Sequence, residues 1–175
     1  MAESVAALPG GGGIGGVNNI LSSLQAKDVM RTSVVWADPD DTVEQIIEEM
    51  QHNNTGYVMV GKEGKLEGIV SKSDVRGALS PYLQSMFVKW RSSMDIATLQ
   101  IKAQWVMSRP VRTVRPDATL LSVIQAITEH GGRCMPVADE EGLKGIITVF
   151  DIFNALLGLA EATTAGRATE APPLT

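Results

Sequence analysis

The sequence predicts an α/β (α+β) fold in which a β-α-β-β-α unit occurs twice and the two copies pack against each other. Three observations lead to this prediction: an internal repeat at a constant offset, the same alternation of extended and helical patterns in both copies, and the same motif at the last strand-to-helix turn. A chain of 175 residues is long enough for one ordinary domain or for two small units that share a core.

The internal repeat is the strongest of these signals. Each pair of matching residues is separated by 77 positions, without a gap: Val29-Met30 and Val106-Met107, Pro39-Asp40 and Pro116-Asp117, Thr42 and Thr119, Val60 and Val137, Gly68 and Gly145, Asp74 and Asp151. Chance matches do not hold one offset over such a length. We therefore expect two copies of one structural unit.

Each copy has the same order of predicted elements. A short extended run, at 34–36 and at 111–114, leads through a Pro-Asp turn into an amphipathic helix, with apolar residues spaced by three or four over 43–50 and 120–127. Gly56 and Gly131-Gly132 follow these helices, where a left-handed cap is expected. Two apolar strands come next, at 57–60 and 66–70 and at 134–138 and 143–147, and a second helix begins near Ser71 or Thr148.

A shared motif marks the turn from the last strand into this second helix. It reads GIVSKSD at 68–74 and GIITVFD at 145–151. The hydroxyl residue and the Asp three positions later have the spacing of a helix N-cap. The same turn also suits a nucleotide, because unpaired amides favour phosphate and a carboxylate accepts hydrogen bonds from ribose hydroxyls.

These features together resemble a tandem pair of CBS (cystathionine-β-synthase) domains, a Bateman module, over about residues 26–157. The resemblance rests on four sequence features: the repeat spacing, the Val-Met before the first strand, the Pro-Asp-x-Thr helix entry and the terminal Gly-Ile-x-Ser/Thr-x-x-Asp. It implies repeats packed by their sheets with pseudo-two-fold symmetry, modules that pair into disc-like dimers, and clefts that bind AMP, ADP, ATP or S-adenosylmethionine. It also implies a free-standing, bacterial-type CBS protein.

The resemblance assigns roles to individual residues. Asp74 and Asp151 would bind ribose, with Ser71, Ser73 and Thr148 donating on the phosphate or ribose side. The base would lie against the first strands and near the residues before the middle strands, which are Val34, Val35, Val111, Arg112, Gly56 and Arg133. Two departures make equal occupancy of the clefts doubtful: Met59 stands where the second copy has Pro136, and Phe150 stands where the first copy has Ser73. The arginines of the second copy favour a ligand anchored by Asp151 and Thr148.

The remaining segments complete the predicted organisation. Residues 1–19 are expected to form a flexible Gly-rich tail, 20–79 the first repeat, 80–101 a helical connector that starts at Ser80-Pro81, 102–160 the second repeat, and 161–175 a flexible tail. The connector is net basic, whereas residues 26–75 carry an excess of Asp and Glu.

Composition excludes several classes of function. A net charge of −5 argues against nucleic acid as the main partner, and no apolar run is long enough to span a membrane. The lone Cys134 cannot form an internal disulfide, and the start of the chain lacks the pattern of a secretion signal, so we expect a cytoplasmic protein. His52 and His130 have no partners at metal-ligand spacing, and no catalytic constellation is recognisable, so neither a metal nor an enzymatic activity is predicted.

The sequence leaves three hypotheses of function to be tested. The first is a non-enzymatic sensor that binds an adenine nucleotide between the repeats, forms a homodimer and alters its interaction with an unidentified protein, with S-adenosylmethionine ranked below AMP, ADP and ATP as ligand and no cofactor required. The second is a ligand-free oligomerisation scaffold, in which the Ser, Thr and Asp residues only cap helices. The third, an enzyme, would have to turn over a nucleotide.

Overall fold

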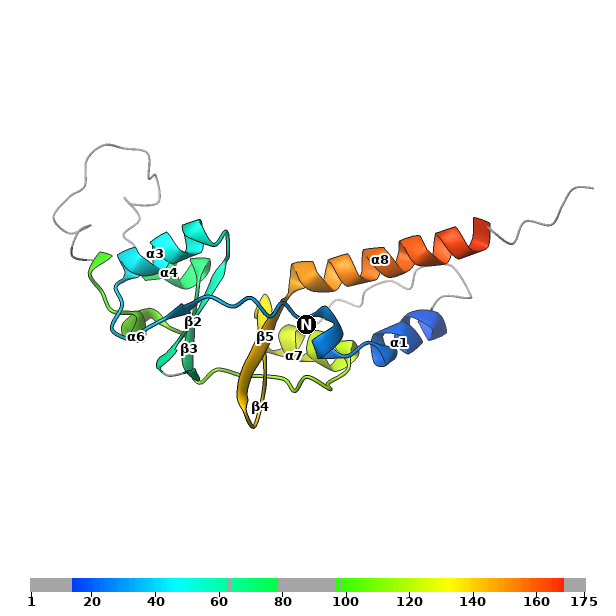
Figure 1. Cartoon of the computed structure of the whole chain (residues 1–175), viewed down its shortest axis with the longest axis horizontal. Coiled ribbons are helices and arrows are strands. Elements are labelled where there is room, and N and C mark those ends of the chain that lie inside the picture. The colour runs from blue at the N-terminus through cyan, green and yellow to red at the C-terminus, as the bar shows by residue number, and fades with distance from the viewer. Residues whose placement is uncertain (1–13, 63, 79–96, 98, 169–175) are drawn as a thin grey trace, which may run out of the picture.

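The computed structural model describes residues 14–62, 64–78, 97 and 99–168, which form two lobes of the same construction (Figure 1). The first lobe contains β1 (Trp36–Ala37), α3 (Val43–His52), β2 (Tyr57–Lys62), β3 (Lys65–Ser71) and α4 (Lys72–Ala78). The second contains α7 (Leu120–His130), β4 (Cys134–Asp139), β5 (Gly142–Thr148) and α8 (Val149–Ala168). The mixed α and β fold is confirmed, and so is the predicted order of elements, except for the first strand of the second repeat.

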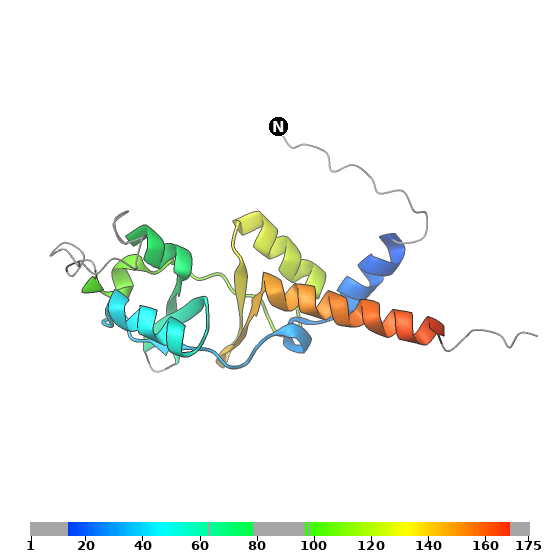
Figure 2. The same ribbon diagram turned by 90° about the horizontal axis from the view of Figure 1, so that it is seen from above.

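An antiparallel hairpin is the centre of each lobe, with two helices beside it (Figure 2). In the first hairpin Tyr57 pairs with Ser71, and in the second Cys134 pairs with Thr148. Both hairpins shift register at the same place, after Val60 and after Val137, so even this irregularity repeats. Gly64 and Gly142 take positive φ values of 79° and 121° at the hairpin turns, which a side chain would disfavour.

The first strand of the unit differs between the lobes. In the first lobe β1 lies parallel to β2, and the Met59 amide donates to the Val35 carbonyl at 2.8 Å. In the second lobe only an isolated bridge between Val114 and Val137 remains of the strand predicted at 111–114. The equivalent of Met59 is Pro136, which has no N–H to donate, so the pairing cannot extend in that direction.

The amphipathic helices begin as predicted but end differently. Thr42 caps α3 by accepting from the Gln45 amide, and Thr119 caps α7 by accepting from the Ser122 amide. Gly131 closes α7 with a left-handed φ of 67°, as expected. In the first lobe Asn54 takes the left-handed conformation, with φ 45°, so the prediction that Gly56 would do so is wrong. Asn tolerates this region, and the turn is completed before Gly56.

The short segment that precedes each repeat in the chain packs on the lobe formed by the other repeat. Helix α1 (Ile14–Ser23) and α2 (Ala26–Val29) add Leu21 and Ala26 to the core of the second lobe, whereas α6 (Ala103–Val106) and the residue after it add Ala103 and Met107 to the core of the first. The exchange is reciprocal, because Ala26 donates to the Ala118 carbonyl at 2.8 Å and Ala103 donates to the Asp41 carbonyl at 2.7 Å. Figure 1 shows the chain crossing between the lobes after α2 and again after α6.

This exchange explains the glycine that opens the repeated motif. A Cβ atom on Gly68 would collide with the Met107 side chain, and one on Gly145 would lie 2.5 Å from the Arg31 carbonyl oxygen. In both lobes the exchanged segment passes directly over the last strand. Glycine is therefore favoured by crowding from the Met107 side chain at Gly68 and by close approach of the Arg31 backbone at Gly145, independently of any ligand.

The ends of the described chain differ from the predicted tails. Residues 14–19, assigned above to a flexible tail, belong to α1, and residues 161–168 belong to α8. Leu21 of α1 is buried in the second core, which gives this helix a packing surface that the Gly-rich composition concealed. The predicted helix start at Ser80-Pro81 and most of the connector lie outside the described residues. Within the described ranges, no helix is both long and apolar enough to cross a membrane.

Candidate functional site

A cleft of about 1350 Å³ lies between the two lobes and is lined by residues of both. Nine of the eleven residues predicted for the site line it: Gly56, Ser71, Ser73, Asp74, Val111, Arg112, Arg133, Thr148 and Asp151. Val34 and Val35 do not, although their equivalents Val111 and Arg112 do. Val35 packs against the first core instead and bonds to Met59, so its part in the prediction is not supported by the geometry. The cleft has room for a nucleotide.

The two strand-to-helix turns face this cleft with matching hydrogen bonds. Asp74 Oδ2 accepts from the Ser71 amide at 2.7 Å and from Ser71 Oγ at 2.6 Å. Asp151 Oδ2 accepts from the Thr148 amide and Thr148 Oγ1 at the same two distances. The predicted capping role is therefore present in both copies, and it occupies only one oxygen of each carboxylate.

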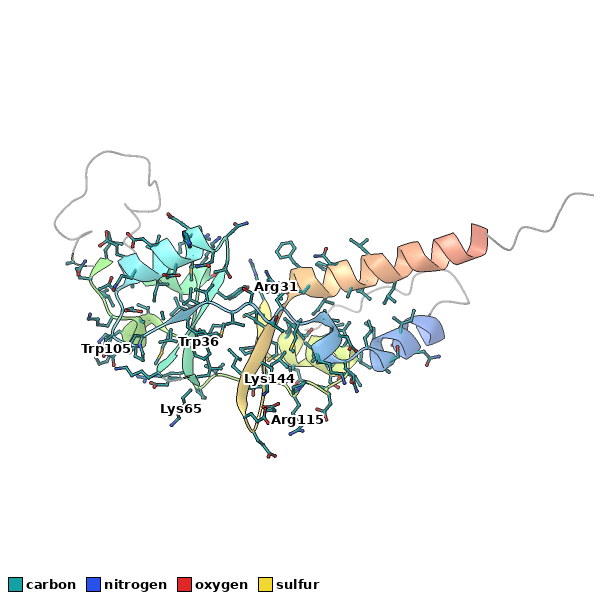
Figure 3. All side chains as sticks on the ribbon, viewed as in Figure 1. Arg31, Trp36, Lys65, Trp105, Arg115 and Lys144 are labelled. Atoms are coloured by element: carbon teal, nitrogen blue, oxygen red, sulfur yellow. The ribbon has the colours of Figure 1, made fainter. Side chains whose placement is uncertain are left out.

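The second carboxylate oxygen has a different neighbour in each lobe. Asp151 Oδ1 forms an ion pair with Arg31 Nε at 3.0 Å, and Arg31 Nη2 also donates to Thr148 Oγ1 at 3.4 Å. Asp74 Oδ1 accepts only from Ser108 Oγ, at 3.3 Å, among the contacts of the described residues. Figure 3 places Arg31 between the two lobes, close to the start of α8. Sequence reasoning missed both Arg31 and Ser108, because the exchange that brings them to the opposite lobe is invisible in the repeat spacing.

A group of cationic and polar side chains lines the cleft on the second lobe. Arg112 Nη1 lies 2.7 Å from Nε2 and 2.8 Å from Nδ1 of His130, and Arg133 lines the same cleft. Because a guanidinium can only donate, His130 acts as acceptor in this contact. The equivalents of these three residues in the first repeat are Val35, Asn53 and Gly56, which carry no charge. From the sequence, His130 was expected only at a helix end and not in the site.

Tyr57 and Cys134 occupy equivalent positions where the two lobes meet the cleft. Burial raises the pKa of the Tyr57 hydroxyl; the nearby Cys134 and Asp74 raise it further, and Arg133 lowers it. Burial, with a smaller contribution from Asp74, raises the pKa of the Cys134 thiol to about 12. Asp74 of the first repeat therefore shares this part of the cleft with Arg133 and Cys134 of the second. A thiol with so high a pKa is a poor nucleophile.

No group of three or more His, Cys, Asp or Glu side chains suited to a metal ion occurs among the described residues. The cleft instead combines one carboxylate in each lobe, cationic side chains and the apolar surfaces of Ile69, Val111 and Met135. Such a site can accept hydrogen bonds from vicinal hydroxyls, neutralise an anion and cover a flat apolar group.

The comparisons with known proteins agree with this architecture. The model of the CBS domain matches residues 26–81 and 101–158. A relative from Arabidopsis thaliana, the mitochondrial CBS domain-containing protein CBSX3, is 28% identical over 145 residues, which cover 77% of this chain and 66% of the plant protein.

Two solved structures have the same fold. The CBS domain pair of protein MJ0100, in complex with 5′-methylthioadenosine and S-adenosyl-L-methionine, superposes with a TM-score of 0.62 at 20% identity and covers 77% of this chain and 97% of its own. The cytosolic domain of the Mg²⁺ channel MgtE, in complex with ATP, superposes with a TM-score of 0.57 at 24% identity and covers 74% of this chain and 48% of its own. At these identities the likeness concerns the fold. Because the family model matches both repeats, the chain belongs to the CBS domain family, as a tandem pair of CBS domains.

Proposed function

We propose that this chain is a non-enzymatic regulatory module that binds an adenosine-containing ligand in the cleft between its repeats and thereby alters its interaction with a partner protein. The observation that carries the proposal is the arrangement around Asp74. One oxygen of this carboxylate is fixed by Ser71, and the other accepts, among the described residues, a single long hydrogen bond from Ser108 at the cleft.

A nucleotide fits the chemistry on both sides of Asp74. The ribose hydroxyls would donate to Asp74 Oδ1, which is held in place by the fixed Oδ2. The phosphates would lie toward Arg133 and Arg112, whose guanidinium donors suit phosphate oxygens. The adenine would rest on apolar residues such as Ile69 and Val111. Sequence reasoning favoured Asp151 and Thr148 as the anchor; the contacts of Arg31 with both residues now favour Asp74.

The charge of the cleft favours AMP, ADP or ATP over S-adenosylmethionine. Five Lys or Arg residues line it, namely Arg31, Lys72, Arg76, Arg112 and Arg133, against two carboxylates, Asp74 and Asp151. An excess of cations attracts phosphate and repels the sulfonium group of S-adenosylmethionine. The solved complexes of MJ0100 with adenosine compounds and of MgtE with ATP support the adenosine class without deciding between these ligands.

Regulation follows from the position of the cleft. A ligand that touches both lobes binds most tightly to one arrangement of them, so its binding shifts the population toward that arrangement. A partner protein that contacts both lobes would sense this shift, and its binding would in turn change the ligand affinity. We propose that the ligand and the partner protein bind in the cytoplasm.

The proposal can be tested by thermal unfolding of the purified chain with AMP, ADP, ATP, S-adenosylmethionine and, as a control, GTP. A ligand at about 100 times its dissociation constant stabilises the folded state by about 2.7 kcal/mol, which raises the midpoint by several degrees. Arg133→Ala should remove the shift, whereas Arg115→Ala, at an exposed arginine that pairs with Asp117 outside the cleft, should retain it. No shift with any adenosine compound at millimolar concentration would reject the proposal.

An enzymatic role would require turnover, which chromatography of the nucleotide can measure. ATP incubated with the protein for a day should be recovered intact. Release of ADP or AMP above the level of a protein-free control would instead establish a catalytic activity.

The alternative is a ligand-free scaffold for oligomers, and one observation favours it. Phe150, Phe153 and Leu157 are 77%, 56% and 62% exposed and lie along α8 at helical spacing, so they form an apolar stripe. Phe153→Asp should convert a homodimer into a monomer in analytical ultracentrifugation if the stripe is the dimer surface. An unchanged dimer would place the contact elsewhere, and ligand-independent dimers without any thermal shift would favour the scaffold over the sensor.

A further inference from the structure

Arg31 and Ser108 are equivalent residues of the repeat that act in opposite lobes. They are separated by the repeat offset of 77 positions, and each follows one of the exchanged segments. Through the exchange, Arg31 contacts Asp151 of the second repeat, and Ser108 contacts Asp74 of the first. Asp74 and Asp151 thus make the same hydrogen bonds within their own repeats, but the residue that reaches each of them from the other repeat differs.

The guanidinium of Arg31 covers both groups that the second turn could offer to a ribose. It pairs with Asp151 Oδ1 at 3.0 Å and donates to Thr148 Oγ1 at 3.4 Å. The Asp151 side chain is 12% exposed and the Arg31 side chain 54%, so the contact is shielded from water on the carboxylate side and open to it on the arginine side. A neutral ribose hydroxyl would have to displace a cation from a carboxylate, which is an unfavourable exchange.

The backbone of Arg31 fixes the starting point of this side chain. The Arg31 amide donates to the Ile146 carbonyl, and the Arg31 carbonyl accepts from the Ile146 amide, both at 2.9 Å. Ile146 lies on β5, two residues before Thr148. The arginine is therefore anchored on the strand that leads into the turn it covers, and only its side chain can move away.

The two halves of the cleft also differ in the side chains available to bind the phosphates. Tyr57 lies near both Asp74 and Arg133, so a ligand on Asp74 meets a cation of the opposite lobe. By the repeat offset, the residue that corresponds to Arg133 for a ligand on Asp151 is Gly56, which also lines the cleft but has no side chain to bind phosphate. The half of the cleft around Asp151 thus has a covered carboxylate and lacks the matching arginine.

We infer that Arg31 serves as a built-in occupant of the second ribose site, so that each chain binds one nucleotide, held at Asp74. This inference rests on the proposed function and adds the stoichiometry and the residue that sets it. In effect, the N-terminal segment that carries Arg31 supplies a permanent cation where the other half of the cleft accepts a ligand.

Isothermal titration of the full chain with ATP, or with whichever of AMP and ADP gives the larger thermal shift, tests the inference. The wild type should bind one nucleotide per chain. Arg31→Ser, which copies Ser108, should expose a second and weaker event, and Arg31→Ser with Gly56→Arg should bring the two affinities within about tenfold. The added side chain at Gly56 has space, because nothing lies within 4 Å of its Cβ position. Ser108→Arg should abolish binding at Asp74.

Three controls keep the outcomes distinct. Arg115→Ser should bind like the wild type, and thermal unfolding of each variant shows that it is folded; Arg31→Gln replaces Arg31→Ser if the latter is not. Two equal sites in the wild type, an unchanged single site in both Arg31 variants, or weaker binding in Arg31→Ser would overturn the inference while leaving the proposed function intact. Absence of binding by the wild type and every variant would reject both.

Discussion

The turn at Ser71–Asp74 and the turn at Thr148–Asp151 use the same hydrogen bonds at nearly the same distances, yet they face different surroundings. Around Asp74 the cleft offers a hydroxyl and the arginine of the opposite lobe, whereas around Asp151 it offers an ion pair with Arg31. The comparison separates two roles of one motif. Its hydroxyl and carboxylate define the helix start in both lobes, and the exchanged segments decide which carboxylate is open to a ligand.

The largest expected effect concerns the common scaffold. Ile46 and Leu120 are both fully buried, each in the core of one lobe, and replacing either by Ala should lower the free energy of unfolding by about 2–5 kcal/mol. Because the exchanged segments tie the two cores together, urea should unfold both variants in one transition, as in the wild type. Two separate transitions, with only one shifted by each substitution, would mean that the lobes unfold independently.

The next prediction separates the two halves of the cleft. Asp74→Asn should weaken nucleotide binding by about 10–100-fold, because a hydrogen bond to a charged group contributes about 1.5–3 kcal/mol. Asp151→Asn should change the affinity by less than about threefold, because Asp151 is already paired with Arg31. Calorimetric titration of both variants provides the comparison. Equal losses in the two variants would show that the halves of the cleft are equivalent.

Helix capping should give a smaller and symmetrical effect. Ser71→Ala and Thr148→Ala each remove the hydroxyl that accepts from the Asp amide at 3.2 or 3.3 Å, and each should destabilise the protein by about 1 kcal/mol. Chemical denaturation of the ligand-free protein measures this directly. A variant as stable as the wild type would remove the capping role from that turn.

The smallest effect concerns Cys134, which lines the cleft where the lobes meet. The Cys134 thiol has a raised pKa of about 12, so only about one molecule in 10⁴ carries a thiolate at pH 8, and the folded protein should react with a thiol reagent far more slowly than the unfolded chain. Because the pKa is raised on folding, the stability that this thiol contributes is present below about pH 9 and is lost as the pH rises toward 12. Cys134→Ala should remove that part of the alkaline loss; reaction at the rate of the unfolded chain would contradict the burial.

Much of the fold could be predicted because local and repeated signals agree. The apolar spacing of α3 and α7, the caps at Thr42 and Thr119 and the two hairpins follow from patterns within a few residues. The short first strand of the second lobe was mispredicted because its β-like pattern conceals the missing N–H of its partner Pro136. Helix α1 was missed because its glycines suggest a tail, whereas burial of Leu21 on the second core provides its support.

The site was harder to predict because its asymmetry arises from long-range contacts. A constant offset of 77 residues describes a chain with exchanged segments and one without them equally well. Only the fold brings Arg31 to Asp151 and Ser108 to Asp74, and only then does the difference between these two equivalent residues acquire a meaning. Val34 and Val35 were assigned through the family resemblance together with Val111 and Arg112, and only the second pair lines the cleft.

The most direct test of this account is a crystal structure of the protein grown with the nucleotide that gives the largest thermal shift. The account predicts one nucleotide per chain, with its ribose hydroxyls on Asp74 and its phosphates near Arg133, while Arg31 remains paired with Asp151. A nucleotide bound to Asp151 with Arg31 displaced, or one in each half of the cleft, would contradict it.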